Sequence, residues 1–227
     1  KWGTKEPEDG QFYTGRKLRS YGNEDGQFND PAGLVIDSDG SVYVADSGNH
    51  RIQVFTPAGR FLRKWGSEDA ENGEFYRPGG LVIDGDGNVH VAEGRYNIRG
   101  GYIQIQVFDP HGNALRKWGS YGQKDGQFYG TPTGLALDSD GNVYVADEGN
   151  HRIQVFDSQG QFLRKWGTMG NEDGQFSRPR RPVLDDEGNV YVADSGNHRI
   201  QVFDPKGGFI SKWGQSGSFG VGRFRYP

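Results

Sequence analysis

The stretch VYVADSGNHRIQVF, residues 42–55, decides the fold because it returns almost unchanged in the same chain. It recurs as VYVADEGNHRIQVF at 143–156 and as VYVADSGNHRIQVF at 190–203. A divergent copy begins with VHVAEG at residue 89 and ends with IQVF at residue 108. The acidic residues after VA are therefore spaced by 47, 54 and 47 positions: Asp46, Glu93, Asp147 and Asp194. A period of this length indicates an array of similar structural units.

Each unit contains the pattern of four short strands joined by tight turns. The apolar run GLVID, which begins at Gly33, predicts a first strand that is buried on both faces and lines a central channel. VYVAD, IQVF and FLRKWG predict the other three strands, and Asp-Gly, Gly-Asn and Pro-x-Gly supply the backbone angles of the turns. Because such a sheet cannot bury both faces alone, we expect like sheets to stack radially.

The elements P-x-G-L-x-x-D, V-x-V-A-D and G-N-H-R-I-Q-V-F resemble NHL repeats of the bacterial type. The Asn-His-Leu that names the family is varied to Asn-His-Arg at 49–51, 150–152 and 197–199. The resemblance covers about Asp30 to Gly214, and several elements recur in order and register. It implies an all-β fold, a β-propeller of four-stranded antiparallel blades. WD40 repeats fit less well, since their Gly-His and Trp-Asp pairs are absent.

We expect one propeller domain with four complete blades and partial elements at both ends. The predicted segments are N-terminal outer-strand remnants at 1–29, blades within 30–214 at about 30–75, 76–128, 129–176 and 177–214, and a connecting segment at 215–227. By the resemblance, propellers of this kind most often close with more blades than four. Two alternatives follow. The terminal segments close a small ring within one chain, or an open arc is completed by neighbouring chains in an oligomer or filament.

Composition limits the classes of partner. The net charge of −4 gives no bulk attraction to nucleic acid, which we therefore do not expect as a partner. The chain has no cysteine, and no apolar stretch approaches the roughly 20 residues that span a bilayer. It begins at Lys1 without Met, so we expect a processed or excised piece of a longer, secreted or extracytoplasmic product.

Residue types that often carry chemistry occupy fixed repeat positions. His50, His151 and His198 share one position, so we expect them to lie apart around the repeat. We expect each histidine and the arginine after it to form hydrogen bonds within or between blades, with the Asp at the strand end as a candidate partner. The DSDG turns lack the ligand spacing of a calcium loop, and no nucleophile elbow, phosphate loop or zinc-binding helix motif occurs. The sequence therefore predicts no catalytic residue, no metal site and no cofactor.

The aromatic residues also recur in register, which is typical of packing between blades. One Trp ends each fourth strand and one Phe follows in the connecting loops: Trp65, Trp118, Trp166 and Trp213, with Phe75, Phe128 and Phe176. Aromatic residues of the terminal segments have no complete blade of their own. We expect them to mediate assembly between chains: Trp2, Phe12, Tyr21, Phe224 and Tyr226.

Departures from the repeat mark candidate binding residues, because loops on a rigid scaffold commonly carry function. The second unit has GRYNIRGGY at 94–102 in place of SGNHR, and the fourth unit has Arg-Pro-Arg-Arg-Pro at 178–182. Arginine pairs suit carboxylates or phosphates. The candidate ligand-binding residues are Arg95, Tyr96, Arg99, Tyr102, Arg178, Arg180 and Arg181. The alternative is that these arginines are solvated or pair with nearby acids.

The leading functional hypothesis is a non-catalytic scaffold that binds a protein partner or other copies of the same chain. An enzyme with one active site needs blades that differ, whereas these blades are alike. The resemblance leaves two alternatives open. One is a propeller enzyme, either a metal-dependent lyase or a lactonase-like hydrolase. The other is an RNA-binding NHL domain.

Overall fold

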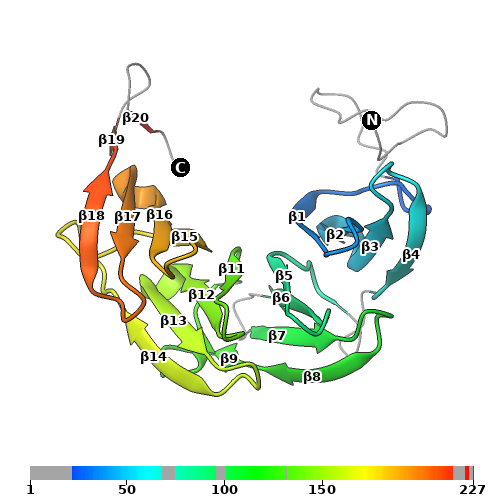
Figure 1. The fold of residues 1–227 in the computed structure, drawn as a ribbon, viewed down its shortest axis with the longest axis horizontal. Coiled ribbons are helices and arrows are strands. Elements are labelled where there is room, and N and C mark those ends of the chain that lie inside the picture. Colours follow the sequence, from blue (N-terminus) through cyan, green and yellow to red (C-terminus); the bar gives the residue numbers. More distant parts are fainter. Residues whose placement is uncertain (1–21, 68–74, 96–100, 131, 217–222, 225–226) are drawn as a thin grey trace. The chain divides into compact units, whose positions relative to one another are not determined.

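The part of the chain that the structure describes is all-β, apart from three short 3-10 turns. The computed structural model describes residues 22–67, 75–95, 101–130, 132–216, 223–224 and 227. Four antiparallel sheets of four strands follow one another along the chain, and in each sheet the strands lie in sequence order (Figure 1). They are the blades of a β-propeller, as the repeat predicts. No helix in the described part of the chain is long and apolar enough to cross a membrane.

The strand bounds follow the repeat. The first blade holds β1 (Pro31–Ile36), β2 (Val42–Asp46), β3 (Arg51–Phe55) and β4 (Phe61–Trp65). The second holds β5 (Leu81–Ile83), β6 (Val89–Arg95), β7 (Tyr102–Phe108) and β8 (Ala114–Trp118). The third holds β11 (Leu135–Leu137), β12 (Val143–Asp147), β13 (Arg152–Phe156) and β14 (Phe162–Trp166). The fourth holds β15 (Pro179–Leu184), β16 (Val190–Asp194), β17 (Arg199–Phe203) and β18 (Phe209–Trp213).

Short parallel pairs lie in the connections that follow an outer strand. β9 (Ser120–Tyr121) pairs with β10 (Gln127–Phe128), and β19 (Gln215–Ser216) pairs with β20 (Arg223–Phe224). The two pairs have the same arrangement, so the C-terminal segment repeats the connection that elsewhere leads into a blade.

Local chemistry explains the turns between strands. Between β1 and β2, Asp37 accepts hydrogen bonds from the backbone N–H groups of Asp39 and Ser41, and Gly40 supplies a φ of 81°. Between β2 and β3 a 3-10 turn at Ser47–Asn49 ends at His50, whose φ is 56°. This turn places Asp46 directly opposite Arg51 across the two strands.

The chain divides into two compact units, Lys1–Gly94 with Gln106–Arg116, and Arg95–Ile105 with Lys117–Pro227. In the first unit, apolar residues of β2 and β3 pack against those of the second blade: Tyr43, Ala45, Ile52 and Val54 with Leu81, Val89, Val91 and Phe108. In the second unit the same positions of the third blade pack against the fourth: Tyr144, Ala146, Ile153 and Val155 with Val190, Val192 and Phe203. Each core therefore lies between the sheets of successive blades.

Outer-strand tryptophans of the first and third blades pack against the next blade, as predicted, whereas Trp213 of the fourth blade is 46% exposed. The ring centroid of Trp65 lies 5.9 Å from that of Phe108, and Trp166 lies 5.8 Å from Phe203. A glycine of the next blade makes room for the indole, because a Cβ at Gly207 would lie 2.8 Å from Trp166. The aromatic positions of the interior blades are thus architectural.

The prediction that every first strand is buried on both faces is wrong. Leu34 and Ile36 in β1 are 65% and 58% exposed, whereas Leu81, at the position of Leu34 in the second blade, is 6% exposed. Burial of this strand requires a sheet on each side. Among the described residues, β1 has the second blade on one side, through Val35, and no sheet against Leu34 and Ile36.

Candidate functional site

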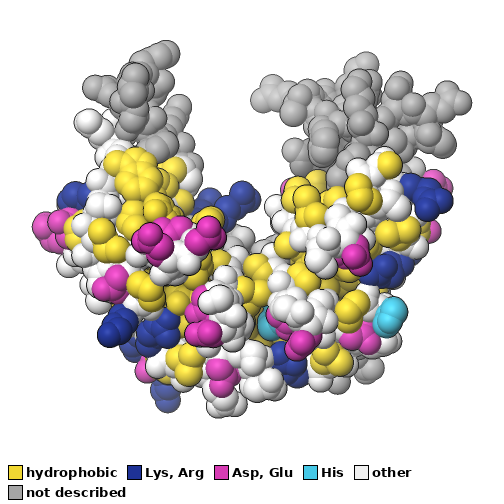
Figure 2. All heavy atoms as spheres, in the orientation of Figure 1, with side chains coloured by type: hydrophobic (Ala, Val, Ile, Leu, Met, Phe, Trp, Pro, Cys, Tyr) yellow, Lys and Arg dark blue, Asp and Glu magenta, His cyan; other side chains and the backbone are white. Residues whose placement is uncertain are grey.

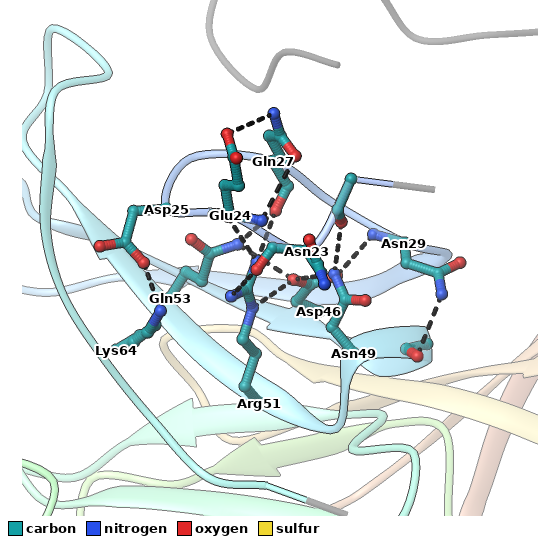
Figure 3. A network of polar contacts seen from close by, with 12 residues as sticks. Asn23, Glu24, Asp25, Gln27, Asn29, Asp46, Asn49, Arg51, Gln53 and Lys64 are labelled. Carbon is teal, nitrogen blue, oxygen red and sulfur yellow. Dashed lines mark hydrogen bonds and ion pairs between the residues drawn. The ribbon is translucent and has the colours of Figure 1, made fainter. Parts of the chain in front are cut away.

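A buried aspartate at the end of β2 organises the polar centre of the first blade (Figure 3). One oxygen of Asp46, Oδ2, accepts from Arg51 Nε at 2.7 Å, Asn49 Nδ2 at 2.8 Å and Gln53 Nε2 at 3.0 Å. The other oxygen, Oδ1, accepts from the backbone N–H of Asn29 at 2.7 Å. Four donors thus compensate the burial of one carboxylate.

The same side chains hold the preceding loop against the blade. Arg51 donates to the backbone carbonyls of Asn23, Glu24 and Gln27 at 2.7 to 2.9 Å. Gln53 donates to the carbonyl of Gln27 at 2.6 Å, and its side-chain oxygen accepts from the N–H of Gly26 at 2.9 Å. The network therefore connects β2 and β3 to residues 23–29, and it leaves little free hydrogen-bonding capacity on Arg51 or Gln53.

Two further blades repeat this network with nearly the same distances. In the third blade Asp147 accepts from Arg152 at 2.8 Å, and in the fourth Asp194 accepts from Arg199 at 2.7 Å. Burial is the largest influence on the pKa of Asp147 and raises it above its usual value, although its donors, with Arg152 among them, oppose the shift. The expected pairing of each arginine with the strand-end aspartate is confirmed.

His50 and His151 form hydrogen bonds between blades, which is one of the predicted arrangements, although their partner is a backbone N–H and not the strand-end aspartate. His50 Nδ1 accepts from the backbone N–H of Arg77 at 3.2 Å, and His151 Nδ1 accepts from that of Arg178 at 3.2 Å. The left-handed backbone at His50 ends the 3-10 turn, and the following Arg51 occupies the position opposite the aspartate. Each of these two histidines therefore connects its blade to the loop entering the next one, which is a structural role.

The second blade keeps part of this network, because Glu93 Oε1 accepts from Gln106 Nε2 at 2.5 Å as Asp46 does from Gln53, and it changes the rest. Glu93 stands in place of aspartate and accepts from the N–H of Tyr76 at 2.7 Å, while Gln104 occupies the arginine position. His90 stands in place of tyrosine, is buried, and its Nε2 lies 3.0 Å from Asp84 Oδ2. Burial is the main cause that lowers the pKa of His90 below its usual value, and Asp84 opposes this shift.

The candidate ligand residues of the second blade lie at the margin of the described structure. Tyr96 and Arg99 lie outside the described residues, and of Arg95 only the backbone at the end of β6 is described. Tyr102 begins β7 and is half-buried. Their role in binding stays a prediction.

The three candidate arginines of the fourth blade are exposed but do not share one role. Arg180 forms a two-pronged ion pair with Glu148 of the third blade, at 2.9 and 3.2 Å. This is the predicted alternative of pairing with a nearby acid. Arg178 and Arg181 are exposed at φ values of 55° and 42°. Glu148 signals its role in the sequence, because it replaces the serine at positions 47 and 195.

The predicted assembly residues also lie mostly beyond the described chain. Trp2, Phe12, Tyr21 and Tyr226 lie outside the described residues, and only the backbone of Phe224 is described, in β20. Whether they mediate contacts between chains stays a prediction, as does the choice between ring closure and an open arc.

The fourth blade has an exposed sheet face that sequence reasoning missed. Val183 and Trp213 are 60% and 46% exposed, and Tyr191 is half-buried, although Tyr43 and Tyr144 at the same repeat position are 2% and 1% exposed. We call the surface formed by Val183, Tyr191, Ala193, Ile200 and Trp213 the end face. Figure 2 shows hydrophobic side chains at the surface of this blade, over β16 to β18.

No described residues form a group of three His, Cys, Asp or Glu side chains that could hold a metal ion. The packing of the blades does not explain the exposed end face or the basic residues at the start of β15. These two features of the described chain are therefore candidate binding sites.

Comparisons with known proteins agree with the repeat analysis. The model of the NHL repeat matches residues 28–55, 130–156 and 176–203. The B-box type zinc finger protein ncl-1 of Caenorhabditis elegans is 38% identical over 131 residues, and Protein brain tumor of Drosophila melanogaster is 27% identical over 131 residues. Both alignments cover 58% of this chain, which spans 14% and 12% of the length of these relatives. These relatives are eukaryotic, so a bacterial origin stays a prediction.

Solved structures share the fold at low sequence identity. Virginiamycin B lyase from Staphylococcus aureus has a TM-score of 0.60 at 16% identity, covering 81% of this chain and 55% of that one. Kuenenia stuttgartiensis hydrazine synthase has a TM-score of 0.58 at 14% identity, covering 86% of this chain and 52% of that one. Together with the four antiparallel blades, these matches show that the chain carries NHL repeats and has the β-propeller fold.

Proposed function

We propose that this NHL β-propeller is a non-catalytic scaffold that binds protein partners and assembles with copies of itself. The observation that carries this proposal is the end face. The tyrosine and alanine of VYVAD and the isoleucine of RIQVF are buried in the first and third blades, but they are only half-buried in the fourth. An exposed apolar surface rimmed by polar residues is typical of a protein-binding site.

The repeated polar residues support a binding role over a catalytic one. Asp46, Asp147 and Asp194 are buried. Each accepts hydrogen bonds from an arginine, an asparagine, a glutamine and a backbone N–H. A catalytic carboxylate must reach a substrate, whereas these oxygens face donors of their own blade. The named lyase among the structural relatives shares only the fold, which does not determine chemistry.

Selection of binding peptides tests the proposal directly. Peptides selected from a random library on the intact chain should lose most of their affinity for the Trp213→Arg variant, because the charge and length of arginine disrupt the apolar centre of the end face. The Leu62→Arg variant is the matched control, since Leu62 is an exposed residue of β4 in the first blade. Thermal melting followed by circular dichroism would establish that both variants are folded.

Two outcomes would contradict the scaffold. The first is one equivalent of bound zinc or calcium per chain together with lyase or hydrolase turnover, which would favour the enzyme. The second is retention of single-stranded RNA that weakens steeply with salt, which would favour RNA binding. Selected peptides that bind the Trp213→Arg variant as well as the intact chain would instead place the binding site elsewhere.

A further inference from the structure

Two departures from the repeat fall together on the fourth blade and distinguish its end face from the faces buried inside the chain. The sequence that leads into the first strand reads PAGL from residue 31, PGGL from 78 and PTGL from 132, but PRRP from 179. Arg181 therefore stands where the other blades have glycine. The fourth strands carry arginine at positions 63, 116 and 164, but β18 carries Ser211.

The glycine is required where one blade meets the next. A Cβ at Gly33 would lie 2.4 Å from the carbonyl oxygen of Gly79, and a Cβ at Gly134 would lie 2.4 Å from Cα of Arg181. Both contacts are with backbone atoms, which cannot move aside as a flexible side chain can. A residue with the size of arginine at this position prevents a further blade from approaching the fourth blade as closely as the others approach each other.

In the first and third blades, the arginine of the fourth strand forms a hydrogen bond to the blade that follows. Arg63 donates to the carbonyl of Pro110 at 2.6 Å and to the hydroxyl of Tyr43 at 2.9 Å. Arg164 donates in the same way to Pro205. Ser211 is too short to replace this donor, so the hydroxyl of Tyr191 keeps its bond to Asp185 but has no arginine partner from the fourth strand. The end face thus lacks both the close approach and the hydrogen bond on which blade stacking depends.

The charges around the end face indicate what it can accept. Arg181 and Val183 are both exposed and are two residues apart in β15, while Pro182 between them is buried toward the third blade. Arg178 also precedes this strand and is exposed, but its backbone N–H donates to His151 of the third blade, so the charge beside the end face is that of Arg181. Glu148, the acid of the third blade near this strand, already pairs with Arg180. Positive charge therefore borders the apolar surface at the start of β15.

On these grounds we propose that the end face docks a short protein segment in which carboxylates adjoin apolar side chains, and that it excludes a further blade. A carboxylate would pair with Arg181, and the apolar side chains would cover Val183 and Trp213. This inference rests on the proposed function as a protein-binding scaffold. It names the chemistry of the partner and the surface that receives it.

A peptide suits this surface better than a nucleic acid. β15 is followed directly by Asp185, Asp186 and Glu187, and the last two are exposed. A polyanion lying along the strand would meet these carboxylates, whereas a segment with acids at one end meets only Arg181.

Two fluorescein-labelled peptides test the proposal on the full chain. One has the sequence Asp-Glu-Phe-Val-Leu-Gly-Ser and the other carries Asn-Gln in place of Asp-Glu. Since hydrogen bonds to charged groups are among the stronger ones, the acidic peptide should bind at least about tenfold more tightly, with an affinity that falls as salt is raised. Arg181→Gly should remove this preference, and Trp213→Ala should weaken both peptides. Arg60→Gly, at an exposed arginine of the first blade, should change neither.

Several results would overturn the inference. Equal binding of the two peptides, or an unchanged preference in Arg181→Gly, would reject the acidic partner while leaving the scaffold proposal intact. Tighter binding of an oligothymidylate than of the acidic peptide, sensitive to Arg181→Gly, would assign the face to nucleic acid. No binding of either peptide at millimolar concentration would reject the docking surface. Glycine relieves the positive φ of Arg181, so this variant should fold.

Discussion

Arg152 shows how a residue that looks chemical serves the architecture. Its side chain is 7% exposed and donates to Asp147 and to the carbonyls of Lys124 and Gln127. Arg152→Ala would leave a buried carboxylate without its cation, so the free energy of unfolding should fall by about 3 to 5 kcal/mol. Urea denaturation followed by tryptophan fluorescence measures this change. Arg60→Ala, at an exposed site, should stay within about 0.5 kcal/mol. Similar losses in both variants would contradict the network's role.

His90 gives the second blade a pH dependence of its own. The pKa of the folded state lies below the unfolded value of about 6.5, because burial disfavours the charged imidazole, Asp84 opposes this and Arg116 adds to it. The unfolded state therefore binds more protons, so stability should be complete above about pH 6.5 and be lost as the pH falls toward the folded value. His90→Tyr, the residue of the other blades, should flatten this loss in urea titrations between about pH 7 and 5. An unchanged slope would show that His90 is not its source.

At the scale of the element, glycines set the distance between first strands. Gly134→Ala would place a methyl group against the backbone of Arg181 and should cost about 1 to 3 kcal/mol of unfolding free energy. Gly85→Ala is the matched control, because a Cβ there meets nothing within 4 Å and the turn should be unaffected or slightly stabilised. Differential scanning calorimetry of the two variants compares them. If both melted at the same temperature, close strand approach would not matter for stability.

The strands and turns could be predicted from the sequence because the repeat shows each element three or four times with its turn residues in place. The partners of the buried residues could not, since Gln53 and Gln154 look like ordinary strand residues until the loop that they hold is seen. The exposed fraction of a side chain also could not be predicted from the repeat. Tyr43 and Tyr191 lie in identical copies of the segment VYVAD, yet among the described residues only Tyr43 has a sheet packed against it. The repeat describes one blade well and says nothing of what lies beside it.

At the scale of the whole molecule, the terminal segments lead us to expect self-association. The weight-average mass from sedimentation equilibrium should rise above the 25.2 kDa of one chain over about a hundredfold increase in concentration. Trp2→Ala and Phe224→Ala should weaken the association, because aromatic residues of these segments are the expected contacts. Leu115→Ala, at an exposed residue of β8, should not. A mass of one chain at every concentration would remove assembly from the function and leave the binding of other proteins.

The central claim, that the fourth blade presents a free sheet face to a partner, is tested most directly by hydroxyl-radical footprinting read by mass spectrometry. Three tyrosines at one repeat position act as internal standards, with Tyr43 and Tyr144 2% and 1% exposed and Tyr191 half-buried. The account predicts faster oxidation of Tyr191 than of the other two, together with strong oxidation of the exposed Trp213. Equal protection of all three tyrosines, with Trp213 protected as well, would show that the face is already covered and would contradict the account.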